Sequence, residues 1–269
     1  MVGNAERGTP AALRSALRGV RRMFRPPTPK ITATVRLPAG PPIMSLAELE
    51  AQAAGFPSMG GLELAPFLRG LGRAAPADAA IVEVGVWLGA GTAQLACALA
   101  QRAREGAAVP VLYCYDRWLA QKSEVQKTAS RNTWALKRGQ NTLPRVVEAL
   151  SPFGVEICFR QGEIIEAQWA DGPIGVYIDD ASKKPKLFRT VMRKFGPHWI
   201  PGKTVVLLMD YSFYLSTGNE EHSCQARFVE AHADHFEPID LDVREPGCAA
   251  AFRYVKEVDF EAAIARGVL

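Results

Sequence analysis

Short apolar runs alternate with longer amphipathic stretches from about residue 80 onward. The runs are rich in β-branched residues and have the length of buried strands, whereas the stretches between them carry apolar residues at helical spacing. This alternation predicts a parallel sheet that is covered by helices on both faces. The expected strands are 80–86, 109–115, 155–160, 174–178 and 204–209, and the expected helices between and after them are 92–104, 133–151, 184–195 and 220–233.

The end of the chain departs from this alternation. Two further apolar runs, 236–243 and 249–255, are joined across 244–248, a connection too short for a crossover helix. They are therefore expected to form an antiparallel hairpin. The predicted fold class is α/β: a Rossmann-like sheet of seven mostly parallel strands that ends in a C-terminal antiparallel β-hairpin, with helices on both faces.

The N-terminal region has a different composition from the rest of the chain. Residues 1–43 hold seven Arg and one Lys against the single acid Glu6, a net charge of +7, which leaves −3 for the remainder of a chain whose total is +4. We expect 1–43 to be a basic arm and 44–269 to be the globular domain, opening with a helical cap at 44–75. A slightly acidic domain of this kind does not favour a nucleic-acid groove.

The cysteines and the lengths of the apolar runs indicate the cellular compartment of the protein. All five cysteines occur singly, without a C-x-x-C pair, which favours reduced thiols over a zinc site or a disulfide framework. No apolar run has the length of a membrane span, and the N-terminus lacks the apolar core of a secretory signal. A cytoplasmic location is expected.

The stretch VEVGVWLGAGT at 82–92 places an acid and three glycines between a strand and a helix. The order is Glu83, then Gly85-x-x-x-Gly89-x-Gly91, which differs from the G-x-G-x-x-G order of dinucleotide-binding turns. Glycine lets a ligand approach the main chain closely, and an acid suits a cationic amino-acid group better than a pyrophosphate. Thr92 is expected to cap the helix. An ordinary strand-to-helix turn is the alternative reading.

Acids also follow the other expected parallel strands. Because ligands of such sheets bind beyond the carboxyl ends of the strands, these acids indicate a binding site at one edge. They are Glu83, Asp116, Glu163, Asp179 with Asp180, and Asp210.

Five motifs together resemble one enzyme family. VEVGVWLGAGT, YCYDRW, RQGE, YIDDAS and IPGKTVVLLMDY have the order and register of the class I S-adenosylmethionine-dependent methyltransferases, notably the small-molecule and sugar O-methyltransferases of the macrocin and catechol groups. The resemblance covers roughly residues 60 to 256. It implies that Glu83 and Gly85 hold the methionine end of S-adenosylmethionine, and that Gly89 and Gly91 allow its close approach.

The resemblance also implies roles for the later acids. Asp116 would accept both ribose hydroxyls, Trp118 would pack near the adenine, and Glu163 would accept from the adenine amino group. Asp179 would face the sulfonium and the acceptor. A hydroxyl acceptor also needs a base, for which the candidates are Asp179, Asp180, Asp210 and His222.

Metal dependence and the acceptor are less constrained by the sequence. Metal-dependent relatives carry two adjacent oxygen ligands after the fifth strand, where this chain has Met209 before Asp210, and a thioether is a poor ligand for a hard cation. No metal is therefore expected. Segments 123–131 and 213–223 are expected to line the acceptor pocket.

The predicted function is methyl transfer from S-adenosylmethionine to a hydroxyl of a small molecule or sugar-containing metabolite. An N- or carboxyl methyltransferase on the same fold, or a catalytically silent cofactor-binding partner subunit, are the alternatives. A small-molecule or sugar acceptor is the expected partner, without nucleic acid or a membrane span, and a homo-oligomer is left open.

Overall fold

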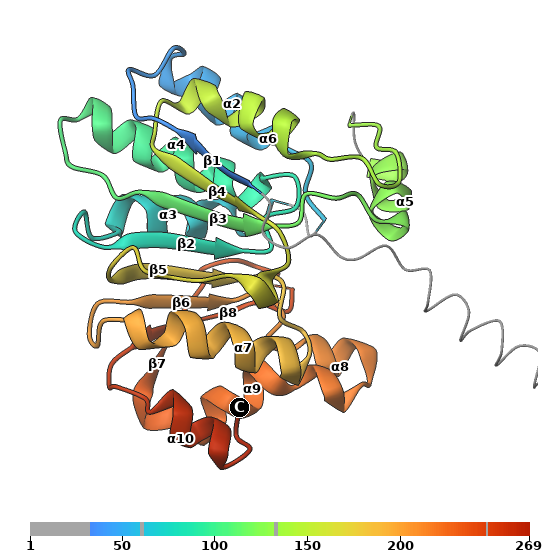
Figure 1. The fold of residues 1–269 in the computed structure, drawn as a ribbon. Coiled ribbons are helices and arrows are strands. Elements are labelled where there is room, and N and C mark those ends of the chain that lie inside the picture. The colour runs from blue at the N-terminus through green and yellow to red at the C-terminus, as the bar shows by residue number, and fades with distance from the viewer. Residues whose placement is uncertain (1–32, 60–61, 132–133, 246) are drawn as a thin grey trace, which may run out of the picture. The chain divides into compact units, whose positions relative to one another are not determined.

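A computed structural model describes residues 33–59, 62–131, 134–245 and 247–269. Its strands are β1 (Ala33–Leu37), β2 (Ala80–Val84), β3 (Leu112–Asp116), β4 (Ile157–Gln161), β5 (Ile174–Asp179), β6 (Val205–Leu208), β7 (Phe236–Ile239) and β8 (Ala250–Tyr254). In this part of the chain they form one sheet in the order β1-β4-β3-β2-β5-β6-β8-β7 (Figure 1).

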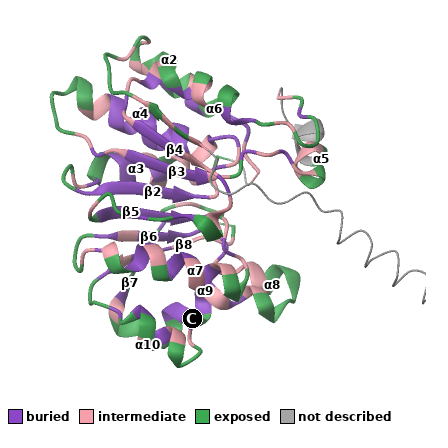
Figure 2. Ribbon diagram, in the orientation of Figure 1, coloured by how far each residue is buried: buried purple, intermediate pink, exposed green. Residues whose placement is uncertain are grey.

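The sheet has the predicted parallel centre and antiparallel end. Strands β4, β3, β2, β5 and β6 are parallel to one another, whereas β8 is antiparallel to both β6 and β7. The expected strands and the C-terminal hairpin are thus confirmed. Every residue of β2 and β5 is buried, as strands covered on both faces require (Figure 2).

Helices cover both faces of the sheet. One face packs against α2 (Leu46–Ala54), α3 (Ala65–Ala74), α4 (Ala90–Arg104) and α6 (Leu143–Leu150), and the other against α7 (Pro185–Phe195), α9 (Cys224–Ala231) and α10 (Phe260–Ala265). Successive strand residues alternate between these two cores: Ile81 belongs to the first, and Val82 to the second. The remaining helices, α5 (Lys122–Arg131) and α8 (Phe213–Thr217), lie beyond the carboxyl ends of the strands (Figure 1).

Part of the expected N-terminal arm belongs to the sheet. Strand β1 pairs antiparallel with β4, with Ala33 opposite Gln161 and Leu37 opposite Ile157. The described sheet therefore has an eighth strand where seven were expected. The strand alternates between exposed and half-buried positions, as an edge strand does, and it is too short to give a clear apolar pattern. Residues 1–32 of the arm lie outside the described residues.

Helix boundaries differ from the expectation in three places. The helix expected at 133–151 is confined to α6 from Leu143, where a proline occupies the first turn, and its expected start at Thr133 lies outside the described residues. Helix α5 was not expected. Gly89, with φ 89°, is the N-cap of α4 in place of Thr92, because the turn needs a left-handed residue there.

Helix α2 begins with a capping box. The Ser45 side chain accepts from the Glu48 backbone N–H, and the Glu48 side chain accepts from the Ser45 backbone N–H. No helix of the described residues is long and apolar enough to cross a membrane.

Candidate active site

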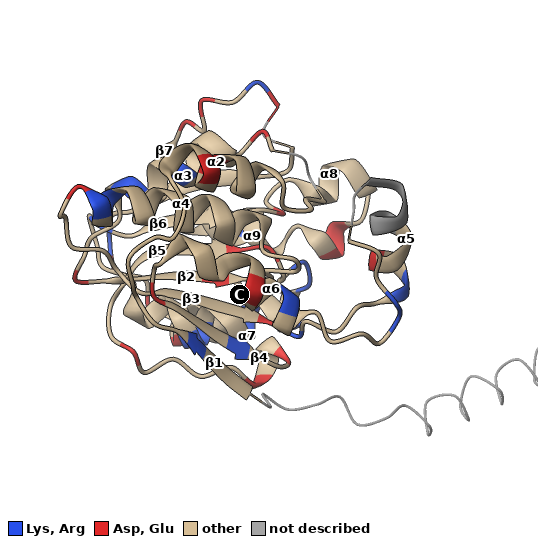
Figure 3. Cartoon of the chain, turned by 90° about the horizontal axis from the view of Figure 1, so that it is seen from above, with Lys and Arg blue, Asp and Glu red and all other residues tan. Residues whose placement is uncertain are grey.

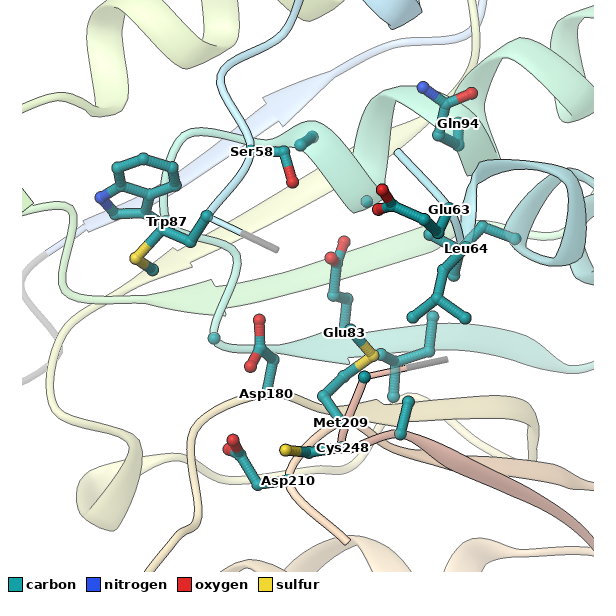
Figure 4. Close-up of a pocket in the computed structure, with 18 of the residues that line it drawn as sticks. Ser58, Glu63, Leu64, Glu83, Trp87, Gln94, Asp180, Met209, Asp210 and Cys248 are labelled. Carbon is teal, nitrogen blue, oxygen red and sulfur yellow. The ribbon is translucent and has the colours of Figure 1, made fainter. Parts of the chain in front are cut away.

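A cavity of ≈ 480 Å³ lies at the carboxyl edge of the sheet (Figure 4). Its walls come from the ends of β2, β5 and β6, the first turns of α4, the segment 58–68 that leads into α3, and the residues 247–249 that precede β8. The volume falls in the range of small-molecule sites. The predicted meeting of strand ends at one edge therefore produces a real hollow.

Glu83 stands at the inner wall of this cavity and is 5% exposed. Its Oε2 accepts a hydrogen bond from Thr92 Oγ1 at 2.5 Å. No cation in the described part of the chain pairs with it, and burial raises its pKa from 4.5 to about 7. A cationic ligand would offset the free-energy cost of ionising this buried carboxyl group. Thr92, expected as a cap, instead orients this acid from within the helix.

The glycines of the turn make room for Glu83 and for the neighbouring loop. A Cβ on Gly91 would lie 2.4 Å from Glu83 Oε1, so only glycine leaves the carboxylate in place. Gly85 has φ +90°, and a Cβ there would lie 2.6 Å from the carbonyl oxygen of Asp180. These two glycines are thus required by the packing of the cavity wall, whereas Gly89 serves as the helix cap.

Asp116 lies at the end of β3, outside the main cavity and beside a second, small hollow of ≈ 10 Å³. Its Oδ2 accepts from the backbone N–H of Trp87 at 2.8 Å, and its Oδ1 from that of Trp118 at 2.7 Å. The backbone N–H of Arg117 also contributes a hydrogen bond to this carboxylate. Burial raises the pKa of Asp116 above its ordinary range despite these bonds.

Two tryptophans flank Asp116. Trp87 has φ 51° and lines both the main cavity and the small hollow, so it separates Glu83 from Asp116. Trp118, with φ 47°, is 1% exposed and packs edge-on against Phe159. The indole N–H groups of both are buried without a hydrogen-bond partner among the described residues, which is rare in folded proteins.

Glu163 follows β4 and forms an ion pair with Arg117 at 3.8 Å. It does not line either hollow in the described residues. The backbone N–H of Gly162 donates a hydrogen bond to the carbonyl oxygen of Asp116. Glu163 is the next residue in the chain. The structure thus brings Asp116, Trp118 and Glu163 to one region of the sheet edge and Glu83 to another.

Asp179 is not at the cavity mouth, where the sequence placed it. Its side chain is fully buried, and its Oδ1 accepts from the backbone N–H of Ala181 at 3.1 Å and of Ser182 at 2.9 Å. The Ser182 hydroxyl donates to Oδ2. These bonds hold the turn after β5, although burial still raises the Asp179 pKa. The acid that lines the cavity is the next one, Asp180.

Asp180 is an exposed residue that lines the cavity. Desolvation and the nearby carboxylate of Asp210 raise its pKa well above the ordinary value, and Lys183 acts in the opposite direction. The one-residue difference between Asp179 and Asp180 reverses the side-chain direction at the end of a strand, which the sequence alone does not reveal.

Asp210 follows β6 and is 5% exposed. Lys183 Nζ donates to Asp210 Oδ1 and lies 4.7 Å from the ring centre of Phe213. Asp210 Oδ2 is buried and has no hydrogen-bond partner. Both ends of this ion pair line the cavity. One carboxylate oxygen of Asp210 is therefore paired with Lys183, and the other has no partner among the described residues.

Two other predicted residues have different surroundings. Met209 lines the cavity as expected. His222 does not: its ring packs against Phe213 at 5.2 Å, and its Nδ1 lies 3.3 Å from Thr217 Oγ1. In the expected acceptor segments, Phe213 reaches the cavity, while Glu124 lines the small hollow. In the described residues, no group of three or more His, Cys, Asp or Glu side chains is placed to hold a metal ion.

Comparison with known proteins gives fold-level matches. No family model and no curated protein matches the sequence. The calicheamicin methyltransferase CalS11 matches with a TM-score of 0.53 and 15% identity, over 95% of this chain and 100% of that chain. The O-methyltransferase NovP matches with a TM-score of 0.51 and 16% identity, over 77% of this chain and 88% of that chain. The chain has the Rossmann-like fold of methyltransferases.

The methyltransferase fold explains the position of the cavity. In open α/β sheets, ligands bind outside the carboxyl ends of the strands near the point where the strand order reverses, here between β2 and β5. Glu83, Asp180 and Asp210 all lie there. Sequence reasoning missed two cavity residues, Lys183 and Glu63. The available signal for Lys183 was its D-x-x-K spacing from Asp180 across a turn. Glu63 reaches the cavity from the helical cap.

Proposed function

We propose that the protein is an S-adenosylmethionine-dependent O-methyltransferase that methylates a hydroxyl of a small molecule or sugar-containing metabolite. The observation that carries the proposal is the cavity itself. It brings the glycine turn and the unpaired carboxylate of Glu83 together with Asp180, Asp210 and Lys183, on a methyltransferase fold.

The residues present fit the cofactor. The ammonium group of its methionine part would supply the cation that Glu83 lacks, and the space left by the missing Cβ of Gly91 keeps that carboxylate accessible. The carboxylate of Asp116 would accept from the ribose hydroxyls. Trp87 and Trp118 would donate their buried indole N–H groups or pack against the base.

Bound S-adenosylmethionine supplies an electrophilic methyl group on a sulfonium. The protein must align an acceptor hydroxyl with it and remove the hydroxyl proton. Asp210 Oδ2 is free to accept a hydrogen bond from that hydroxyl, while Lys183 fixes the other oxygen of the same carboxylate. Asp180 lines the same cavity from the end of β5 and is the carboxyl group suited to receive the proton.

The test is transfer of an isotope-labelled methyl group from S-adenosylmethionine to hydroxyl-bearing metabolites, followed by mass spectrometry of the products. A labelled methyl ether supports the proposal. We expect Asp180→Asn to lower turnover by about 10²-fold or more, as the loss of a general base does, without weakening S-adenosylhomocysteine binding. Cofactor binding without transfer to any hydroxyl compound would instead favour a silent cofactor-binding subunit.

A further inference from the structure

The cavity is lined by more acidic than basic side chains, an excess of potential negative charge. In the described residues, five carboxylates line it and Lys183 is the single basic side chain. Lys183 is already paired with Asp210. The carboxylates are Glu63, Glu83, Asp180, Asp210 and Glu245. Basic residues lie elsewhere in the fold, for example on β1, β4 and α5 (Figure 3).

These acids come from separate parts of the fold. Glu83, Asp180 and Asp210 stand at the strand ends, while Glu63 comes from the segment before α3 (Figure 4). Glu63 forms no ion pair with another described residue. Because these separate segments converge on one hollow, a ligand in it would lie near several carboxyl groups at once.

One of these acids, Asp210, also has a buried polar atom without a hydrogen-bond partner among the described residues. Asp210 is 5% exposed, lines the cavity, and leaves Oδ2 buried without a partner. An unsatisfied buried carboxylate oxygen is costly, so a donor group from a ligand would remove a real penalty.

The cofactor does not neutralise this charge. S-adenosylmethionine carries a carboxylate, an ammonium and a sulfonium, a net charge of about +1 by its ordinary ionisation. Its ammonium would be taken by Glu83. Acids on the acceptor side, Glu63 and Asp180 among them, remain without a cation. The rest of the wall is apolar, with Met59, Leu64 and Phe213 among its members.

We propose that the acceptor carries a protonated amino group, as an amino sugar or another amine-bearing metabolite does, and that phosphorylated acceptors are excluded. This inference rests on the proposed function and names the substrate class of the same site. Phosphate recognition uses arginine, lysine or a helix N-terminus, whereas here a phosphate would face unpaired carboxylates. An ammonium group would instead be attracted to the carboxylates of the cavity wall, Glu63 among them.

The test compares three forms of one sugar by calorimetry on S-adenosylhomocysteine-saturated full-length protein at pH 8. They are methyl glucoside, its 6-amino-6-deoxy form and its 6-phosphate, which differ in charge at a single carbon. We expect the amino form to bind about five- to tenfold more tightly than the neutral form, since partly exposed ion pairs contribute modestly, and the phosphate to bind most weakly. Added salt should reduce the preference for the amine.

Glu63→Gln should reduce the preference for the amine, while the matched surface variant Glu148→Gln should retain it. Equal affinities, tighter binding of the phosphate, or no binding of the amine at millimolar concentration would overturn the inference. The titration that saturates the protein with S-adenosylhomocysteine also tests cofactor binding. It therefore distinguishes a failure of this inference from a failure of the proposed function. A protein that binds the cofactor product and shows no preference for the amine refutes only the acceptor class.

Discussion

The carboxyl group of Glu83 should make the stability of the protein depend on pH in a defined direction. Its pKa is about 7 in the folded protein against 4.5 as the ordinary value, because it is buried without a cation. Since one pKa unit corresponds to about 1.4 kcal/mol, ionising this group in the folded state costs about 3 kcal/mol. Between these two pH values the folded protein holds a proton that the unfolded chain has released. The free energy of unfolding therefore falls as the pH rises from about 4.5 to about 7.

Glu83→Gln removes the titration while the amide oxygen can still accept the Thr92 hydroxyl hydrogen. Urea unfolding of both proteins at pH 5 and pH 8 measures the effect. We expect the wild-type protein to lose about 3 kcal/mol more than the variant between these conditions. Acids that do not interact with Glu83 contribute equally to both proteins and cancel in the comparison. The same pH dependence in wild type and variant would refute the assignment of a buried, unpaired carboxyl group at Glu83.

Three further predictions concern the cofactor, the N-terminus and the metal. Asp116→Asn should weaken S-adenosylhomocysteine binding by about 1.5–3 kcal/mol in calorimetry with an unchanged circular dichroism spectrum, and unchanged affinity would show that the ribose is held elsewhere. Deleting residues 1–30 should leave that affinity intact. Deletion through residue 43 should lower the melting temperature, because it removes strand β1 from its partner β4. Equal melting temperatures would contradict a stabilising role for β1. Methyl transfer should survive chelation of divalent cations, because Lys183 already supplies a cation to Asp210 beside the Met209 thioether. Activity that is lost on chelation and restored by magnesium would make the cavity acids metal ligands.

The sequence predicts the sheet well because its strands have strong local signals. The central strands are buried on both faces and are therefore continuous apolar runs, and a short connection leaves the hairpin no alternative to antiparallel pairing. Strand β1 carried no such signal, since an edge strand of alternating half-buried positions depends on its partner β4 for its conformation.

The candidate site is predictable only in part. The glycine turn and Glu83 were identifiable because their spacing reflects a local backbone requirement. The exchange of roles between Asp179 and Asp180 depends on where β5 ends, and a shift of one residue turns a side chain from the cavity into the core. The pairing of Lys183 with Asp210, like the approach of Glu63, joins segments far apart in the chain and follows from tertiary packing alone.

Calorimetric titration with S-adenosylhomocysteine tests the central claim most directly, with Gly91→Ala as the diagnostic variant and Gly70→Ala as its matched control. A Cβ at Gly91 displaces the Glu83 carboxylate, whereas a Cβ at Gly70 meets nothing within 4 Å. We predict saturable binding by the wild-type protein, unchanged binding by Gly70→Ala, and binding weakened about tenfold or more in Gly91→Ala, as the loss of a charge-assisted hydrogen bond implies. Absence of binding by the wild-type protein, or undiminished binding by Gly91→Ala, would contradict the assignment of this cavity to the cofactor.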